Sequence, residues 1–179
     1  RLKEDQKLID VVEEILKAGV TFLQIREKDL DKESFLEEAI EMRKLAGDYK
    51  VPFVVNDSIE IAQKVDADGV HLGQSDLVDR DIKEIIGKDK ILGISANSVE
   101  TAIDAQKRGA DYIGVGAMFS TSTKGDAKTI PMETLKEIRK AVHIPIVAIG
   151  GISLSNLKEL EGTGIDGISV ISAIFGAED

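Results

Sequence analysis

The sequence predicts an α/β fold built as a (β/α)8 barrel. Short, β-branched apolar runs alternate along the chain with amphipathic helical patterns, such as the one formed by Leu8, Val11, Val12, Ile15 and Leu16. The apolar runs recur at a mean spacing of about 24 residues, which is a compact helix–strand period. A Gly-rich dinucleotide fingerprint does not follow the first run, which lowers the Rossmann alternative to the barrel.

The candidate strands are continuous apolar runs rather than alternating ones, which is typical of parallel strands buried on both faces. Because the chain opens on a helix and shows one strand fewer than a barrel needs, we expect a first strand before Arg1. We also expect the last helix to be missing after Asp179, and residues 1–179 to form a single barrel domain. The strands are expected to begin near Val20, Pro52, Gly69, Ile91, Asp111, Pro145 and Asp166.

Several predicted helices end at glycine, and a short repeat leads from helix to strand. The glycines are Gly19, Gly47, Gly109 and Gly162, which suit helix C-termini. The repeat supports one recurring structural unit, and its copies are Ala67-Asp68-Gly69-Val70, Ala110-Asp111-Tyr112-Ile113 and Ile165-Asp166-Gly167-Ile168.

Composition excludes several classes of function. The chain has no cysteine, so disulfide and thiolate chemistry are excluded, and its formal net charge of −10 disfavours nucleic-acid and membrane-surface partners. No apolar run approaches the roughly 20 residues that span a bilayer. We expect a cytoplasmic protein with small-molecule partners, and the sequence leaves a homo-oligomer open.

Polar residues of the kind that bind anions follow the first candidate strand. With a period of two, Gln24, Arg26 and Lys28 project to one side, where Arg forks onto oxygens and Lys acts as a point charge. The alternative is a solvated exit from the strand.

Two aspartates follow consecutive candidate strands. Asp57 and Asp76 would meet at the carboxyl ends of parallel strands, where two carboxylates with waters and phosphate oxygens suit Mg²⁺. The alternative is that Asp57 caps the helix Ser58–Lys64 and that Asp76 caps a turn.

Further phosphate-binding candidates follow the later strands. The hydroxyl-rich segment from Ser120 to Asp126 has one ammonium, Lys124, and suits the binding of phosphate oxygens, with a surface loop as the alternative. We expect the loop from Ser120 to Thr129 to be a lid that the ligands order. Gly150-Gly151 and Ser172 follow the last two strands, where barrels often bind phosphate, although turn geometry explains the glycines equally well.

Taken in order, these motifs resemble thiamine-phosphate synthase from about Leu8 to Gly176. The resemblance implies a (β/α)8 barrel that joins hydroxymethylpyrimidine diphosphate to a thiazole phosphate and releases diphosphate. The segments that carry it are Gln24-Ile-Arg-Glu-Lys28, Val55-Asn56-Asp57, Gly69-Val-His-Leu-Gly-Gln74, Gly93-Ile-Ser95, Gly109-Ala-Asp-Tyr-Ile-Gly-Val-Gly116, Thr121-Ser-Thr-Lys124 and Ala148-Ile-Gly-Gly-Ile152.

The resemblance also implies roles for individual residues. The expected cofactor is Mg²⁺, bound by Asp57 and Asp76, and the expected route is a pyrimidine carbocation that needs no protein nucleophile. Ser95, Lys124 and Arg26 would be catalytic. The expected substrate-binding residues are Gln24, Arg26, Lys28, Asn56, Ser95 and Lys124 for the pyrimidine diphosphate, and Thr121, Thr123, Gly151, Ile171 and Ser172 for the thiazole phosphate.

Two positions depart from the family pattern, and two rival functions share the fold. Asn97 stands where the family usually has His, and Ser120 where it usually has Pro; we expect Asn97 to cap the next helix, with Glu100 completing a capping box. A thiazole tautomerase would use the histidine that Asn97 replaces. A non-catalytic phosphate-binding barrel would not require both Asp57 and Asp76.

Overall fold

The strands of the protein form a parallel sheet in which each strand's neighbours follow the order of the chain. The computed structural model describes residues 7–121 and 128–176, which fall into two compact units, residues 7–92 and residues 93–176. Strand β4 (Ile91–Ala96) carries the chain from the first unit to the second. The order of the seven described strands is β1-β2-β3-β4-β5-β6-β7, so the class is α/β, as predicted.

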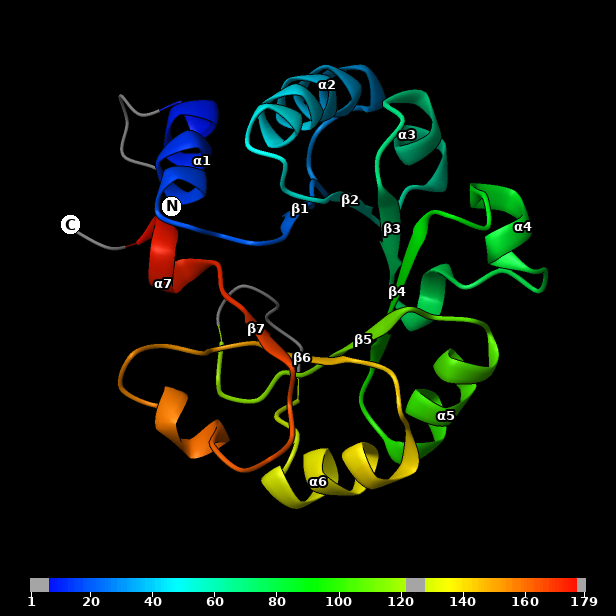
Figure 1. Ribbon diagram of the computed structural model, residues 1–179, viewed down its shortest axis with the longest axis vertical. Helices are drawn as coiled ribbons and strands as arrows, with labels where there is room; N and C mark the ends of the chain where they lie inside the picture. Colours follow the sequence, from blue (N-terminus) through cyan, green and yellow to red (C-terminus); the bar gives the residue numbers. More distant parts are fainter. Residues whose placement is uncertain (1–6, 122–127, 177–179) are drawn as a thin grey trace. The chain divides into compact units, whose positions relative to one another are not determined.

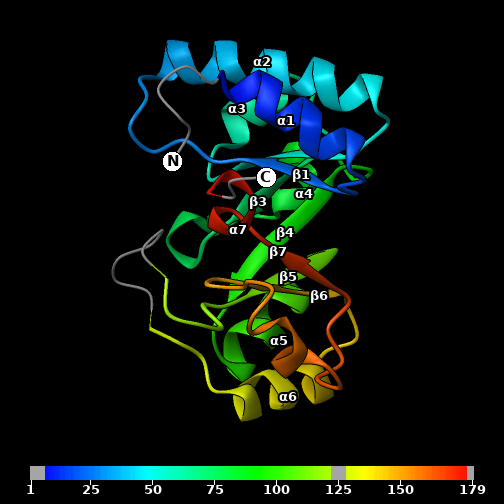
Figure 2. The same ribbon diagram turned by 90° about the vertical axis from the view of Figure 1, so that its left-hand side faces the viewer.

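The first unit combines three parallel strands with helices that lie along them. Helices α2 and α3 lie beside the strands, and α1 packs on α2 (Figures 1 and 2). The elements of this unit are α1 (Leu8–Lys17), β1 (Leu23–Ile25), α2 (Lys32–Asp48), β2 (Phe53–Asn56), α3 (Ile59–Lys64), β3 (Gly69–Leu72), the short 3₁₀ helix η1 (Gln74–Asp76) and α4 (Ile82–Ile86).

The second unit repeats this arrangement. Helix α5 packs on β5 and against α6, as Figure 1 shows at the green and yellow part of the ribbon. Its elements after β4 are α5 (Val99–Lys107), β5 (Tyr112–Val115), α6 (Met132–Ala141), β6 (Ile146–Ile149), the 3₁₀ helix η2 (Leu157–Leu160), β7 (Gly167–Ser169) and α7 (Ser172–Phe175).

Strand β2 shows why the apolar runs are continuous. All four of its residues are buried, and Phe53, Val54 and Val55 expose none of their surface. A strand whose successive side chains point to opposite faces can bury all of them only if both faces are covered. The prediction of strands buried on both faces is therefore confirmed for β2, and β3 shows the same pattern.

The repeated aspartates attach the start of one strand to the start of its neighbour. The Asp68 backbone N–H donates to Phe53 O at 2.8 Å, and the Asp68 carboxylate accepts from the Phe53 N–H at 2.8 Å. In the second unit, Asp166 makes the same pair of bonds with Ile146, again at 2.8 Å each. Each aspartate thus closes a two-bond bracket that fixes strand register.

An arginine from a preceding helix supports each bracket. In the first unit, Arg43 Nη2 lies 3.4 Å from Asp68 Oδ1, and Arg43 Nε donates to the Asp66 carbonyl. In the second unit, Arg139 Nη1 lies 3.1 Å from Asp166 Oδ2, and Arg139 Nη2 donates to the Val142 carbonyl. The short sequence repeat therefore marks a repeated structural device in the two units.

Two predicted boundaries were wrong. The first strand begins at Leu23 rather than near Val20, because the Val20 N–H still bonds Ile15 O at the end of α1. Helix α2 does not stop at Gly47 but ends at Asp48, and the left-handed residue that follows it is Lys50, with φ 56°.

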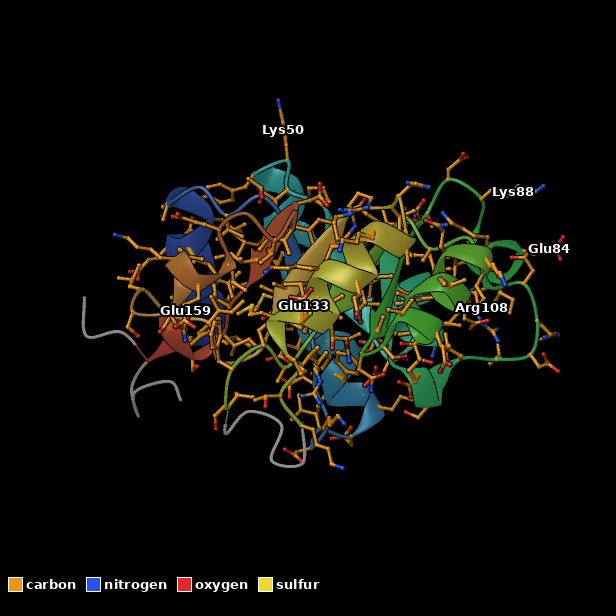
Figure 3. All side chains as sticks on the ribbon, turned by 90° about the horizontal axis from the view of Figure 1, so that it is seen from below. Lys50, Glu84, Lys88, Arg108, Glu133 and Glu159 are labelled. Carbon is orange, nitrogen blue, oxygen red and sulfur yellow. The ribbon has the colours of Figure 1, made fainter. Side chains whose placement is uncertain are left out.

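In Figure 3, which draws the side chains on the ribbon, Lys50 extends far from the backbone. Within residues 7–121 and 128–176, none of the helices combines the length and the apolar character that crossing a membrane requires.

The brackets predict a specific loss of stability. Replacing Asp68 or Asp166 with Ala leaves the N–H of a fully buried residue, Phe53 or Ile146, without its acceptor. Each change should lower the free energy of unfolding by about 1–3 kcal/mol, measured by chemical denaturation. The exposed Asp79→Ala is the control, and equal effects at all three positions would contradict the bracket.

Candidate functional site

An amide pair stands at the carboxyl ends of β1 and β2 in the first unit. The Gln24 Nε2 donates to Asn56 Oδ1 at 2.9 Å, and Asn56 is only 8% exposed. The register brings them together, because Gln24 lies opposite Val54 and Asn56 is two residues further along β2. Gln24 is exposed between the buried Leu23 and Ile25, and because β1 ends at Ile25, the predicted projection of Arg26 and Lys28 to the same side stays a prediction.

Two cations follow β1 along the chain. Arg26 comes directly after the strand and is half-buried, while Lys28 is exposed two residues later. Lys28 lies close enough to Asp76 for its charge to oppose the rise in the pKa of that carboxyl. The charge of Lys28 therefore acts on one of the two predicted metal ligands.

Asp57 and Asp76, here called the acidic pair, are brought together as expected. Asp57 follows β2 in a left-handed conformation, φ 62°, and its N–H donates to His71 O in β3 at 2.9 Å. Asp76 ends η1, and burial, together with the charge and hydrogen bonding of Asp57, raises the pKa of its carboxyl above the usual value. Two carboxyl groups held this close favour a shared proton or a bound cation.

Gly73 shapes the acidic pair. Its N–H donates to Asp76 Oδ2 at 3.1 Å, so the predicted turn-capping role of Asp76 is also present. A Cβ added to Gly73 would stand 2.7 Å from Asp76 Oδ2 and 3.9 Å from Asp57 Oδ1. Only glycine lets the Asp76 carboxylate occupy this position without a shift.

The acidic pair suits a hard cation whose other ligands are water molecules and substrate oxygens. In residues 7–121 and 128–176, there is no cluster of three or more His, Cys, Asp or Glu side chains that could hold a metal ion. Mg²⁺ is usually held by one or two carboxylates, with waters and substrate phosphates completing its shell. The acidic pair fits that pattern and does not fit a closed structural metal site.

The capping predictions were wrong at two helices. Ser58, not Asp57, caps α3, with its Oγ accepting from the Ile61 N–H at 3.2 Å, so Asp57 is not used as the cap. Ser98, not Asn97, caps α5, and Thr101 rather than Glu100 completes the capping box. In both cases the serine one residue later reaches the first turn of the helix.

The second unit has a cavity of about 310 Å³, here called the hydroxyl cavity. It unites three predicted thiazole-phosphate residues, Thr121, Gly151 and Ser172, from segments that follow β5, β6 and β7. Among the described residues, those that line it carry hydroxyl groups, apolar groups or no side chain: Ser120, Thr121, Gly151, Ile152, Ser153, Ser172 and Ala173.

Backbone bonds hold two walls of the hydroxyl cavity together. The Met118 N–H donates to Ile149 O at 2.9 Å, and the Phe119 N–H donates to Gly150 O at 3.0 Å. Gly151 has φ 66°, and a Cβ there would meet Ser120 O at 2.5 Å. Glycine is therefore required at 151 both for its backbone conformation and for this close approach.

Of the remaining predicted residues, those within the described part of the chain lie neither in the acidic pair nor among the residues that line the hydroxyl cavity. Ser95 lies within β4 and is half-buried, and Ile171 precedes α7 with 44% of its surface exposed. Thr123 and Lys124 lie outside the described residues, as does most of the predicted lid.

Two residues shape the site although the sequence does not predict that role. Gly73 stands within a longer motif, and Asn156 lies outside every predicted site segment. Asn156 directly precedes η2 but does not cap it, because its side chain turns back to bond the Gly151 carbonyl at 2.8 Å. An asparagine at a helix start predicts a cap, so the sequence signal pointed elsewhere.

A second cavity in the same unit, of about 250 Å³, is lined by Leu157, Leu160, Glu161, Gly162, Gly164 and Ile165. None of the predicted site residues that the structure describes lines this second cavity, whereas Thr121, Gly151 and Ser172 line the hydroxyl cavity.

Comparison with known proteins places the chain. The family model described as thiamine monophosphate synthase matches residues 1–174. The chain is 51% identical to the thiamine-phosphate synthase of Ruminiclostridium cellulolyticum, over 100% of this chain and 85% of that protein. It is 47% identical to the thiamine-phosphate synthase of Clostridium acetobutylicum, over 99% of this chain and 84% of that protein.

A solved structure shows the same likeness. The thiamine phosphate pyrophosphorylase of Pyrococcus furiosus matches with a TM-score of 0.88 and 41% identity, over 97% of this chain and 84% of that one. The chain therefore belongs to the thiamine monophosphate synthase family and is an enzyme of that family.

Proposed function

We propose that this enzyme joins 4-amino-2-methyl-5-hydroxymethylpyrimidine diphosphate to 4-methyl-5-(2-phosphoethyl)thiazole, giving thiamine phosphate and diphosphate. The observation that carries the proposal is the acidic pair, which meets next to Gly73 and whose Asp76 carboxyl feels the charge of Lys28. Two carboxylates and a cation at the ends of neighbouring strands suit a metal-bound diphosphate better than a single phosphate.

The pyrimidine diphosphate is assigned to the first unit. Arg26 and Lys28 would bind its diphosphate oxygens, and the Gln24–Asn56 amide pair would supply further polar contacts. Asp57 and Asp76 would hold Mg²⁺. When bound, the ion would neutralise part of the charge on the diphosphate.

The proposed reaction is dissociative. The bond between the pyrimidine methylene carbon and the diphosphate oxygen breaks, and its electron pair leaves with the diphosphate. The thiazole nitrogen then forms the new bond to the resulting pyrimidine carbocation. The protein's task is to stabilise the leaving charge with Arg26, Lys28 and Lys124. Ser95 is assigned to the diphosphate near the reaction centre.

The thiazole phosphate is assigned to the hydroxyl cavity of the second unit. Thr121, Gly151 and Ser172 line it, and Thr123 and Ile171 are assigned to the same substrate from the sequence. Hydroxyl and backbone N–H groups are neutral donors that can bind a phosphate monoester without a positively charged side chain. Such donors suit the phosphate of the thiazole substrate, because its charge does not change during the reaction.

For the fold we propose the (β/α)8 barrel. The strands in chain order and the likeness to the Pyrococcus furiosus structure support it.

The acidic pair predicts a loss of turnover. Asp57→Asn and Asp76→Asn each keep an acceptor oxygen, and Asn tolerates the left-handed backbone of residue 57. Each variant should lower kcat/KM by about 100-fold or more at a fixed Mg²⁺ concentration, because the metal loses a charged ligand. Thermal stability should stay near that of the parent. Unchanged turnover at every Mg²⁺ concentration would remove that residue from the metal site.

Gly73→Ala tests the same site without removing a ligand. The new methyl group must displace the Asp76 carboxylate, so we expect half-maximal activity to need several-fold more Mg²⁺. The control is Gly47→Ala on α2, where a Cβ meets only Arg43 Nη1 at 3.9 Å. An identical Mg²⁺ dependence in the two variants would contradict the role of Gly73.

The two substrates should respond to different substitutions. Arg26→Ala should lower kcat and raise KM for the pyrimidine diphosphate, by about 100-fold in kcat/KM, because the cation faces the leaving group. Ser172→Ala should mainly raise KM for the thiazole phosphate. Steady-state kinetics with each substrate varied in turn measures both, and the division fails if the two variants affect both substrates equally.

A further inference from the structure

The side chain of Asn156 spans the loop that forms one wall of the hydroxyl cavity. Its Nδ2 donates to the Gly151 carbonyl at 2.8 Å, and its Oδ1 accepts from the Ser153 N–H at 2.9 Å. These partners also fix the orientation of the amide, since a carbonyl needs a donor and an N–H needs an acceptor. Both bonds are partly buried.

The two bonds fix the peptide between Gly151 and Ile152. A trans peptide is planar, so its C=O and N–H point in opposite directions. With the Gly151 carbonyl held by Asn156, the Ile152 N–H must point away from Asn156. The neighbouring Ser153 N–H is already used, whereas no acceptor for the Ile152 N–H is found among the described residues. Ile152 itself lines the hydroxyl cavity.

We propose that Asn156 is a positioning residue that turns the Ile152 N–H toward the phosphate group of the thiazole substrate. This inference rests on the proposed function, because it takes thiazole phosphate as the ligand of the hydroxyl cavity. Asn156 does not touch the substrate. It acts through the backbone, and its amide is free to do so because it makes no capping bond at the start of η2.

The orientation of this one peptide matters because the lining that the structure describes carries no charged side chain. Binding of an anion then depends on neutral donors, each aimed at an oxygen. If the peptide between Gly151 and Ile152 turned over, the anion would face a carbonyl oxygen in place of an N–H. The attraction between the Ile152 N–H and the anion would be replaced by repulsion from the Gly151 carbonyl, although the same residues would line the cavity.

The test compares Asn156→Leu with Ser155→Ala in the full chain. The leucine variant is neutral and of similar size but lacks both bonds, and Asn156→Ala serves as a second variant if leucine strains the loop. The control removes only the hydroxyl that lies 2.8 Å from Ser153 Oγ and leaves the Asn156 bonds intact. Melting temperatures are recorded for all variants, and only folded proteins are compared.

Calorimetry with each substrate gives the first result. Asn156→Leu should weaken binding of thiazole phosphate by about 10-fold or more, which is the usual effect of losing a hydrogen bond to a charged group. Binding of the pyrimidine diphosphate should be unchanged, and Ser155→Ala should change neither. Equal weakening of both substrates, or none, would overturn the role of Asn156.

The Ile152 amide proton gives the second result. Titration of the ¹⁵N-labelled parent with thiazole phosphate should move this resonance downfield, and the shift should be lost in Asn156→Leu. A resonance that does not move in a parent that binds thiazole phosphate would overturn the inference alone. A parent that binds no thiazole phosphate would overturn the proposed function and the inference together.

Discussion

The register of the parallel strands is the constraint on which the rest of the structure depends. The Asp68 and Asp166 brackets tie β3 to β2 and β7 to β6 at their amino ends, and the register decides which residues emerge at the carboxyl ends of these strands. A shift of one residue would turn every side chain to the opposite face. The Gln24–Asn56 bond exists only in the observed register.

The two units distribute charge differently, and the proposed chemistry accounts for the difference. The first unit contains the acidic pair and Lys28. There the proposed diphosphate would take the electron pair of the broken C–O bond and so gain negative charge. The second unit offers hydroxyl groups around a cavity, where the assigned phosphate would keep the same charge throughout. Charged side chains are costly to desolvate, so they are best placed where charge changes during the reaction.

Most of the fold could be predicted because its signals are local. The apolar runs predicted the strands, and the repeated aspartates marked the helix-to-strand connections that became brackets. Asp57 and Asp76 were predicted to approach each other because parallel strands share one carboxyl edge. That reasoning needs only the order of the strands.

Other features depended on competition between neighbouring groups, which the sequence does not resolve. Val20 is apolar and β-branched, yet its N–H bonds the end of α1, so β1 starts later. Asn97 and Ser98 are both good capping residues, and the serine took the role. Gly73 and Asn156 act through contacts with Asp76 and Gly151 that appear only after the chain has folded.

The left-handed backbone of Asp57 affects how related sequences should be compared. Residues other than glycine adopt this conformation at a cost, and aspartate and asparagine bear that cost most easily. Backbone geometry alone therefore narrows this position to a few residue types, whatever the side chain binds. A relative that has lost its activity would still tend to keep aspartate, asparagine or glycine here. An aspartate at position 57 is thus weak grounds for inferring activity in a distant relative. Asp76, whose position carries no such restriction on φ, is the more informative residue of the two.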